Sequence, residues 1–119
     1  MFSPVLLDHF QHPRNAGDLP GANVRVEVSN PVCGDVLQLA AVVENKTIRE
    51  ARFLCRGCAA SIASASLLTE SLQGRELNTL SSLTTESLAA SLGGLPPASF
   101  HAAQLAHDAL QALLHAAQK

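Results

Sequence analysis

Residues 35–74, DVLQLAAVVENKTIREARFLCRGCAASIASASLLTESLQG, decide the fold because the hydrophobic period changes within them. The first part predicts two apolar strands, 35–44 and 47–55, joined by a tight hairpin at Asn45-Lys46. From Cys58 onward, small and apolar residues recur at helical spacing as far as Gly74, a residue type that often follows a helix end. The stretch therefore predicts a β-hairpin followed directly by a helix.

The segments before this stretch add one helix and one strand. Ser3, followed by proline and apolar residues, predicts a capped short helix that stops before Pro13. A loop rich in proline, glycine and asparagine follows. Residues 23–29, NVRVEVS, alternate valine with polar residues, which is the period of a half-buried strand.

The segments after Gly74 are predicted to be helical. Thr84 is a candidate cap for a short helix, and Ser99 is a candidate cap for a long helix rich in alanine and leucine. Strands followed by helices predict the α+β class, with a small three-stranded antiparallel sheet packed by helices on one side and a long C-terminal helix. We expect residues 1–119 to form one domain.

Composition excludes several classes of function. The 119 residues are 47% hydrophobic and carry a formal net charge of -2, which argues against binding to nucleic acid or anionic lipid. No run reaches the roughly 18 apolar residues of a membrane span, and the first residues lack the basic region of a signal peptide. An odd count of three cysteines argues against a disulfide framework, so we expect free thiols in a reducing cytoplasm.

Residues with metal-binding chemistry are predicted to meet at one end of the sheet. Cys33 precedes one strand of the hairpin, and Cys55 and Cys58 stand at the exit of the other. Because the two strands are antiparallel, these points share one end of the sheet. Thiolates and imidazole both bind iron and zinc. His101, at the start of the last helix, is therefore a further candidate ligand, and Asp35 adds a carboxylate oxygen.

Cys55 and Cys58 have the spacing of a C-x-x-C motif, but the pair alone supplies only two ligands. A thioredoxin-like motif should follow the first strand of a βαβ unit, whereas this pair follows a hairpin. Strict alternation along the strand puts Cys55 on the face of Arg49 and Phe53, opposite Ile48, which predicts a core thiol. At Cys58, the start of a helix favours the thiolate form and makes it a better ligand.

The remaining histidines are predicted to have no role in this site. His107 and His115 lie on the predicted last helix and are expected at the solvated surface. His9 and His12 flank the end of the first helix and are expected to be caps or surface residues.

The motifs NPVCGDVLQL and ARF…GCAASIASASLLTE…GRE, in this order, resemble the U-type iron–sulfur cluster assembly scaffolds, the IscU/SufU and NifU N-terminal-domain family. The segments LLDHFQHPRNAGDL and LPPASFHAAQLAHDALQALL are also similar to that family, so the resemblance runs from about Ser3 to about Ala117. It implies a small antiparallel sheet packed by helices. It also implies a scaffold that receives sulfur from a cysteine desulfurase, builds a [2Fe–2S] cluster and passes it to apo-proteins. Many members also bind zinc at the same ligands.

The resemblance assigns site residues by position, with one departure. Cys33 and Cys58 match two of the three family cysteines, and Asp35 matches the site aspartate. The third family cysteine should follow His101, where this sequence has Ala102. The lysine that follows LPPV in some members, where a dedicated chaperone recognises it, is also absent.

The hypothesis from the sequence is a site of Cys33, Cys58 and His101, with Asp35 or Cys55 as the fourth ligand. It would hold iron, a labile [2Fe–2S] cluster, or zinc as an alternative occupant. We expect a non-enzymatic carrier, a monomer or weak homodimer, that works with a desulfurase and apo iron–sulfur acceptors. The alternatives are a zinc-dependent sulfurtransfer partner of a desulfurase, and a degenerate paralogue with only a structural metal.

Overall fold

The computed structural model describes residues 2–31 and 34–118, and it has the α+β architecture that the sequence predicts. Three strands come before the main helices, and a short helix precedes the strands. Two 3₁₀ turns, which the sequence analysis did not predict, lie between the later helices. The elements are α1 Pro4–Gln11, β1 Val24–Ser29, β2 Val36–Glu44, β3 Thr47–Arg56, α2 Ala59–Leu72, η1 Leu77–Ser82, α3 Thr85–Ser91, η2 Pro97–Ser99 and α4 Phe100–Ala117.

The sheet is antiparallel with the strand order β1-β2-β3. Leu39 of β2 stands opposite Val26 on one side and Phe53 on the other. The β2–β3 hairpin turns at Asn45 and Lys46, whose φ angles of 51° and 61° lie in the left-handed region. A two-residue turn of type I′ requires this region at both positions, so the predicted hairpin is confirmed.

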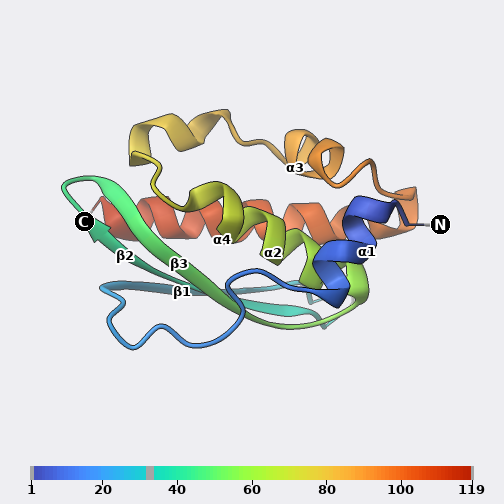
Figure 1. The fold of residues 1–119 in the computed structure, drawn as a ribbon, viewed down its shortest axis with the longest axis horizontal. Helices are drawn as coiled ribbons and strands as arrows, with labels where there is room; N and C mark the ends of the chain where they lie inside the picture. The colour runs from blue at the N-terminus through green and yellow to red at the C-terminus, as the bar shows by residue number, and fades with distance from the viewer. Residues whose placement is uncertain (1, 32–33, 119) are drawn as a thin grey trace.

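The helices cover one face of the sheet (Figure 1). α4 packs against β1 and β2, and α2 packs against β3 and lies beside α4. α1 packs on α2, while α3 packs on α2 and α4. The core between these layers is built almost entirely from leucine and alanine, with Phe53 as its buried aromatic side chain among the described residues. This arrangement brings the start of α2 and the start of α4 to the same end of the sheet as the start of β2.

One face assignment from strict alternation is wrong. The β2–β3 register shifts between Val42 and Val43, so Ile48 stands opposite Val43 and Arg49 is the additional residue. Ile48 is fully buried and Arg49 is exposed, the reverse of the predicted faces. A β-bulge changes which residues share a face, and period-2 reasoning cannot detect it. Phe53, beyond the bulge, is in the core as predicted.

Two of the three predicted helix caps are present. The Ser3 side chain accepts a hydrogen bond from the Leu6 N–H, and Thr84 forms a reciprocal capping box with Ser87. Ser99 precedes α4, but within the described residues its side chain makes no capping hydrogen bond. Its φ of -108° and ψ of 2° differ from the extended backbone of a capping residue, because the η2 turn already occupies this segment.

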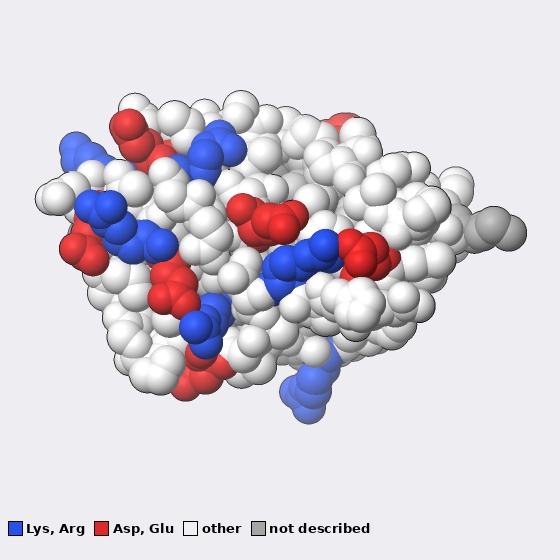
Figure 2. All heavy atoms as spheres, in the orientation of Figure 1, with Lys and Arg blue, Asp and Glu red and all other residues white. Residues whose placement is uncertain are grey.

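The charged side chains of both signs are interspersed on the face of the molecule drawn in Figure 2. No extended field of one sign covers that face, in agreement with the small net charge. Within residues 2–31 and 34–118, no helix is long and apolar enough to cross a bilayer.

Candidate metal centre

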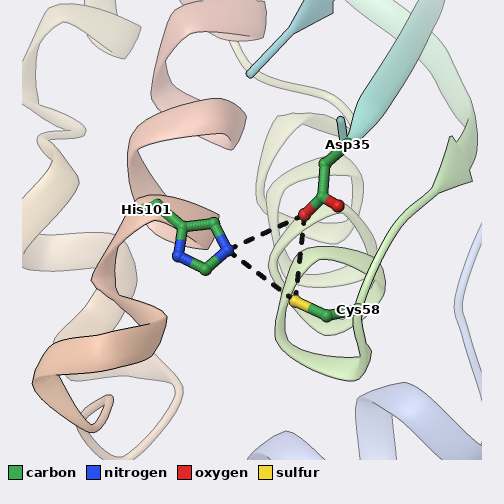
Figure 3. Close-up of side chains that lie close together, drawn as sticks. All are labelled: Asp35, Cys58 and His101. Atoms are coloured by element: carbon green, nitrogen blue, oxygen red, sulfur yellow. Dashed lines mark hydrogen bonds and ion pairs between the residues drawn. The ribbon is translucent and has the colours of Figure 1, made fainter. Parts of the chain in front are cut away.

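Three side chains from three different elements point toward one another at one end of the sheet (Figure 3). Asp35 stands just before β2, Cys58 just before α2, and His101 in the first turn of α4. Cys58 Sγ lies 3.8 Å from Asp35 Oδ2 and 3.9 Å from His101 Nε2. His101 Nε2 lies 3.8 Å from the same Asp35 oxygen. The three atoms thus form a nearly equilateral triangle of one sulfur, one nitrogen and one oxygen.

The triangle has the dimensions of a metal-binding group. Its centre lies about 2.2 Å from each atom, since that distance is the side of 3.8 Å divided by √3. Zinc binds thiolate at about 2.3 Å, imidazole at about 2.0–2.1 Å and carboxylate at about 2.0–2.2 Å. Separations of 3.8–3.9 Å are too long for strong hydrogen bonds. The three atoms are thus far enough apart for all of them to reach one cation.

The turn between β1 and β2 sets the position of Asp35. The Gly34 N–H donates to the Asn30 carbonyl at 2.7 Å, and the Asn30 N–H donates to the Asp35 carbonyl at 2.9 Å. Gly34 has a φ of 78°, a region that L side chains rarely adopt, so glycine suits this turn. Asp35 is only 6% exposed. A carboxylate that is buried to this extent needs donors or a cation around it.

Two groups that the sequence analysis missed contact the Asp35 carboxylate. The Ser61 hydroxyl donates to Oδ2 at 2.5 Å and lies 3.4 Å from Cys58 Sγ. At Gly57, a β-carbon would lie 2.8 Å from the Asp35 carboxyl carbon and 3.0 Å from both of its oxygens. The sequence offered only a weak signal, because small residues and serines are frequent throughout this segment.

His101 is oriented by the backbone before it. Its Nδ1 lies 3.1 Å from the Ala98 carbonyl oxygen, which can only accept a hydrogen bond. Nδ1 therefore carries the proton, and in the neutral ring Nε2 has a free lone pair directed into the triangle. A ring fixed in this way by a carbonyl is typical of metal-binding histidines.

The sequence matches a known family over nearly its whole length. The family model described as NifU-like N terminal domain matches residues 1–118. The chain belongs to this family. A relative from Archaeoglobus fulgidus, named iron-sulfur cluster assembly scaffold protein IscU 1, is 40% identical over 111 residues, which are 93% of this chain and 72% of that protein. The IscU scaffold protein of Haemophilus influenzae is 38% identical, with 95% of this chain and 92% of that protein covered.

A solved structure shares the fold of this NifU-like chain. A protein from Fervidobacterium islandicum, described as a candidate iron–sulfur cluster assembly scaffold protein for the SUF system, superposes with a TM-score of 0.80. The match covers 95% of this chain and 96% of that one, at 19% identity.

One further relative, from Drosophila melanogaster and 39% identical, is named iron-sulfur cluster assembly enzyme IscU. The expectation that this NifU-like chain is not an enzyme therefore remains a prediction.

Cys55 differs from Cys58 although only two residues separate them. Its half-buried side chain packs against the hydrophobic core, and burial, followed by the charges of Asp35 and Cys58, raises the pKa of its thiol to about 11. Among the described residues, the group of mutually close ligand atoms contains Asp35, Cys58 and His101 but not Cys55. Cys58, in contrast, is exposed.

Two further positions named in the sequence analysis are Cys33 and Ala102. Cys33, together with Val32, lies outside the described residues. Ala102, where the family resemblance implies a third cysteine, is 1% exposed and belongs to the hydrophobic core. The side chain next to His101 is thus a packed methyl group.

The expectation that His9 is a cap or surface residue is wrong. His9 is 4% exposed, and its Nδ1 lies 2.8 Å from the Ser66 hydroxyl of α2. Burial lowers the pKa of His9. The apolar neighbours of His9 within α1 gave no signal for this contact, because α2 makes it from a distant part of the chain.

Proposed function

We propose that this chain is an iron–sulfur cluster assembly scaffold that binds iron or a [2Fe–2S] cluster as cargo at the end of the sheet. The observation that carries the proposal is the triangle of Asp35 Oδ2, Cys58 Sγ and His101 Nε2, whose sides are 3.8–3.9 Å. Relatives at 38–40% identity over most of the chain are named as scaffold proteins for this process. Family membership and the donor set of the site thus support the same function.

The proposed ligands are Cys33, Asp35, Cys58 and His101, with Cys55 as the alternative to Asp35. The buried carboxylate of Asp35 and the lone pair of His101 Nε2 favour the first set. Soft thiolates bind iron and its clusters well, while a carboxylate is a harder and weaker ligand for them. A cluster held by two thiolates and such weaker ligands is expected to be labile, which suits a carrier that passes its cargo on.

The proposed partners follow from this role. A scaffold needs a sulfur donor, which we propose is a cysteine desulfurase, and apo iron–sulfur proteins that accept the cluster. The protein itself is proposed to be a non-enzymatic carrier in the reducing cytoplasm, acting as a monomer or weak homodimer over residues 1–119. Neither nucleic acid nor a membrane is required, in keeping with the net charge of -2.

Anaerobic reconstitution with ferric iron and sulfide tests the proposal. The wild-type chain should take up both and develop the visible charge-transfer absorption of a thiolate-bound cluster. Cys33→Ala and Cys58→Ala should each abolish it, while Cys55→Ala and Asp35→Ala show which of these two residues is the fourth ligand. A wild-type protein that takes up no iron under these conditions refutes the proposal.

A second candidate is a zinc-dependent sulfurtransfer partner of a desulfurase. The size of the triangle favours this candidate. The distance of about 2.2 Å from its centre to each atom suits Zn²⁺ bonds to sulfur, nitrogen and oxygen. In this case the protein as isolated should contain zinc and increase desulfurase turnover, and a persulfide should be detected by mass spectrometry on one of its cysteines. If no cysteine carries persulfide after incubation with an active desulfurase and cysteine, this candidate is excluded.

A further inference from the structure

We propose that Ser61 is a positioning residue, which holds the Asp35 carboxylate against Gly57 so that it binds a metal through one oxygen, Oδ2. The inference deepens the proposed function and rests on it. Ser61 lies in the first turn of α2, is 1% exposed and donates its hydroxyl proton to Oδ2 at 2.5 Å. Hydrogen bonds of about 2.5–2.7 Å are typical of a hydroxyl that donates to an ionised carboxylate.

The contacts of the carboxylate are concentrated on one atom. Ser61, Cys58 and His101 all approach Oδ2 of Asp35. A carboxylate oxygen has two lone-pair sites. Ser61 occupies one of them, and the other remains for a cation at the centre of the triangle. Binding through this single oxygen follows from the direction in which Ser61 holds the group.

Gly57 provides the second constraint on the same carboxylate. Its backbone packs so close that a β-carbon would lie 2.8 Å from the carboxyl carbon of Asp35. A side chain at position 57 would therefore displace Asp35 from the triangle. A ligand that is fixed before the metal arrives loses less conformational freedom on binding, which increases the affinity.

The chain offers a matched pair of serines for the test. Ser64 lies on α2 three residues after Ser61 and is fully buried, and within the described residues its hydroxyl has no hydrogen-bond partner. Ser61→Ala and Ser64→Ala remove the same atom from the same helix, but only the first changes a contact of Asp35. Zinc affinity, measured by competition with a chromophoric chelator, should fall about 10–100-fold in Ser61→Ala and stay at the wild-type value in Ser64→Ala.

A double-mutant cycle shows whether Ser61 acts through Asp35. In an Asp35→Ala background, Ser61→Ala should cause no further loss of zinc affinity, because the group that it positions is absent. A purely structural role of Ser61 would lower the affinity in both backgrounds. Ser61→Thr, which keeps the hydroxyl, should retain more affinity than Ser61→Ala.

The zinc-affinity measurements test the role of Ser61, and the reconstitution tests the scaffold function. Equal zinc affinity of Ser61→Ala and wild type overturns the role of Ser61 and leaves the proposed function intact. If Ser61→Ala fails to fold, as judged by circular dichroism, Gly57→Ala decides instead, and wild-type affinity of that variant overturns the inference. A wild-type chain that binds no zinc also overturns it, whereas iron and sulfide reconstitution decides the scaffold function independently.

Discussion

Two groups of polar side chains contact α2, and their internal distances differ. At the start of the helix, Asp35, Cys58 and His101 place their donor atoms 3.8–3.9 Å apart. Further along, His9 Nδ1 lies 2.8 Å from the hydroxyl of Ser66. The second distance is that of a completed hydrogen bond, whereas the first leaves room for another atom. The longer distances are compatible with a bound cation, and the shorter one is that of a structural contact.

The shorter contact has a structural role. Ser66 also accepts a hydrogen bond from the Arg14 N–H at 2.8 Å, so one hydroxyl joins α1, the following loop and α2. His9 is 4% exposed and Ser66 is fully buried, so their hydrogen bond satisfies polar atoms that water does not reach. At the start of α2, Ser61 donates to one lone pair of Asp35 Oδ2, whereas His101 Nε2 lies 3.8 Å or more from both Asp35 Oδ2 and Cys58 Sγ. We therefore expect changes at His9 and Ser66 to affect stability, and changes at Asp35, Cys58 and His101 to affect metal binding.

The largest expected effect is the loss of a ligand. Cys58→Ala should reduce zinc affinity by more than the roughly 10–100-fold that follows the loss of a group supporting a ligand. The thermal midpoint should change little, because Cys58 is exposed. Chelator competition and thermal denaturation measure the two quantities on one sample. A large loss of stability with unchanged zinc affinity would show that Cys58 has a structural role and does not bind the metal.

Ser66→Ala should have the opposite effect to Cys58→Ala: a loss of stability without a loss of zinc affinity. It leaves His9 Nδ1 and the Arg14 N–H without their partner, which should lower the free energy of unfolding by about 1–3 kcal/mol. Zinc affinity of the folded protein should not change, because Ser66 does not contact the triangle. Urea denaturation checks the first expectation and chelator competition the second. Stability equal to wild type would show that this contact contributes nothing to the packing of α1.

The fold was predictable where local patterns decide it. The Asn45-Lys46 turn, the strand alternation and the helical period after Cys58 are all properties of neighbouring residues. Antiparallel pairing then brings Asp35 and Cys58 to one end of the sheet, so much of the site could also be predicted. Residue spacing predicts the fold, and spacing together with the family resemblance predicts that Asp35 and Cys58 lie close to each other.

Contacts between distant segments were not predictable. The bulge that buries Ile48 in place of Arg49 depends on how β2 and β3 pair. The burial of His9 depends on α2, and the Ser61 hydrogen bond joins the start of α2 to a residue at the start of β2. In each case the partner lies far along the chain, and no local pattern specifies it.

The two thiols of the C-x-x-C stretch should differ in reactivity. At pH 8, three units below its pKa of about 11, Cys55 is thiolate in only about one molecule in a thousand, and it is also half-buried. Cys58 is exposed and should react with iodoacetamide much sooner. Timed alkylation followed by peptide mass spectrometry measures both rates. Equal rates would contradict the assignment of Cys55 to the core.

A smaller effect concerns the pH dependence of stability. Burial, followed by the positive charge of Arg14, lowers the pKa of His9 below its ordinary value of 6.5, while Glu70 and Asp8 oppose this shift. The unfolded chain thus binds the proton more readily than the folded chain, so His9 should reduce stability as the pH falls below 6.5. Urea midpoints at pH 7.5 and 5.5 should differ less in His9→Gln than in wild type. An identical pH dependence in both proteins would count against the buried neutral imidazole.

The most direct test of the site is the position of the metal. Crystals of the protein loaded anaerobically with ferrous iron alone can be measured by anomalous diffraction at the iron edge. We predict a single iron peak bonded to Cys58 Sγ, Asp35 Oδ2 and His101 Nε2, near the centre of the triangle that these atoms form. Iron bound elsewhere, with these three side chains still 3.8–3.9 Å apart and uncoordinated, would contradict it.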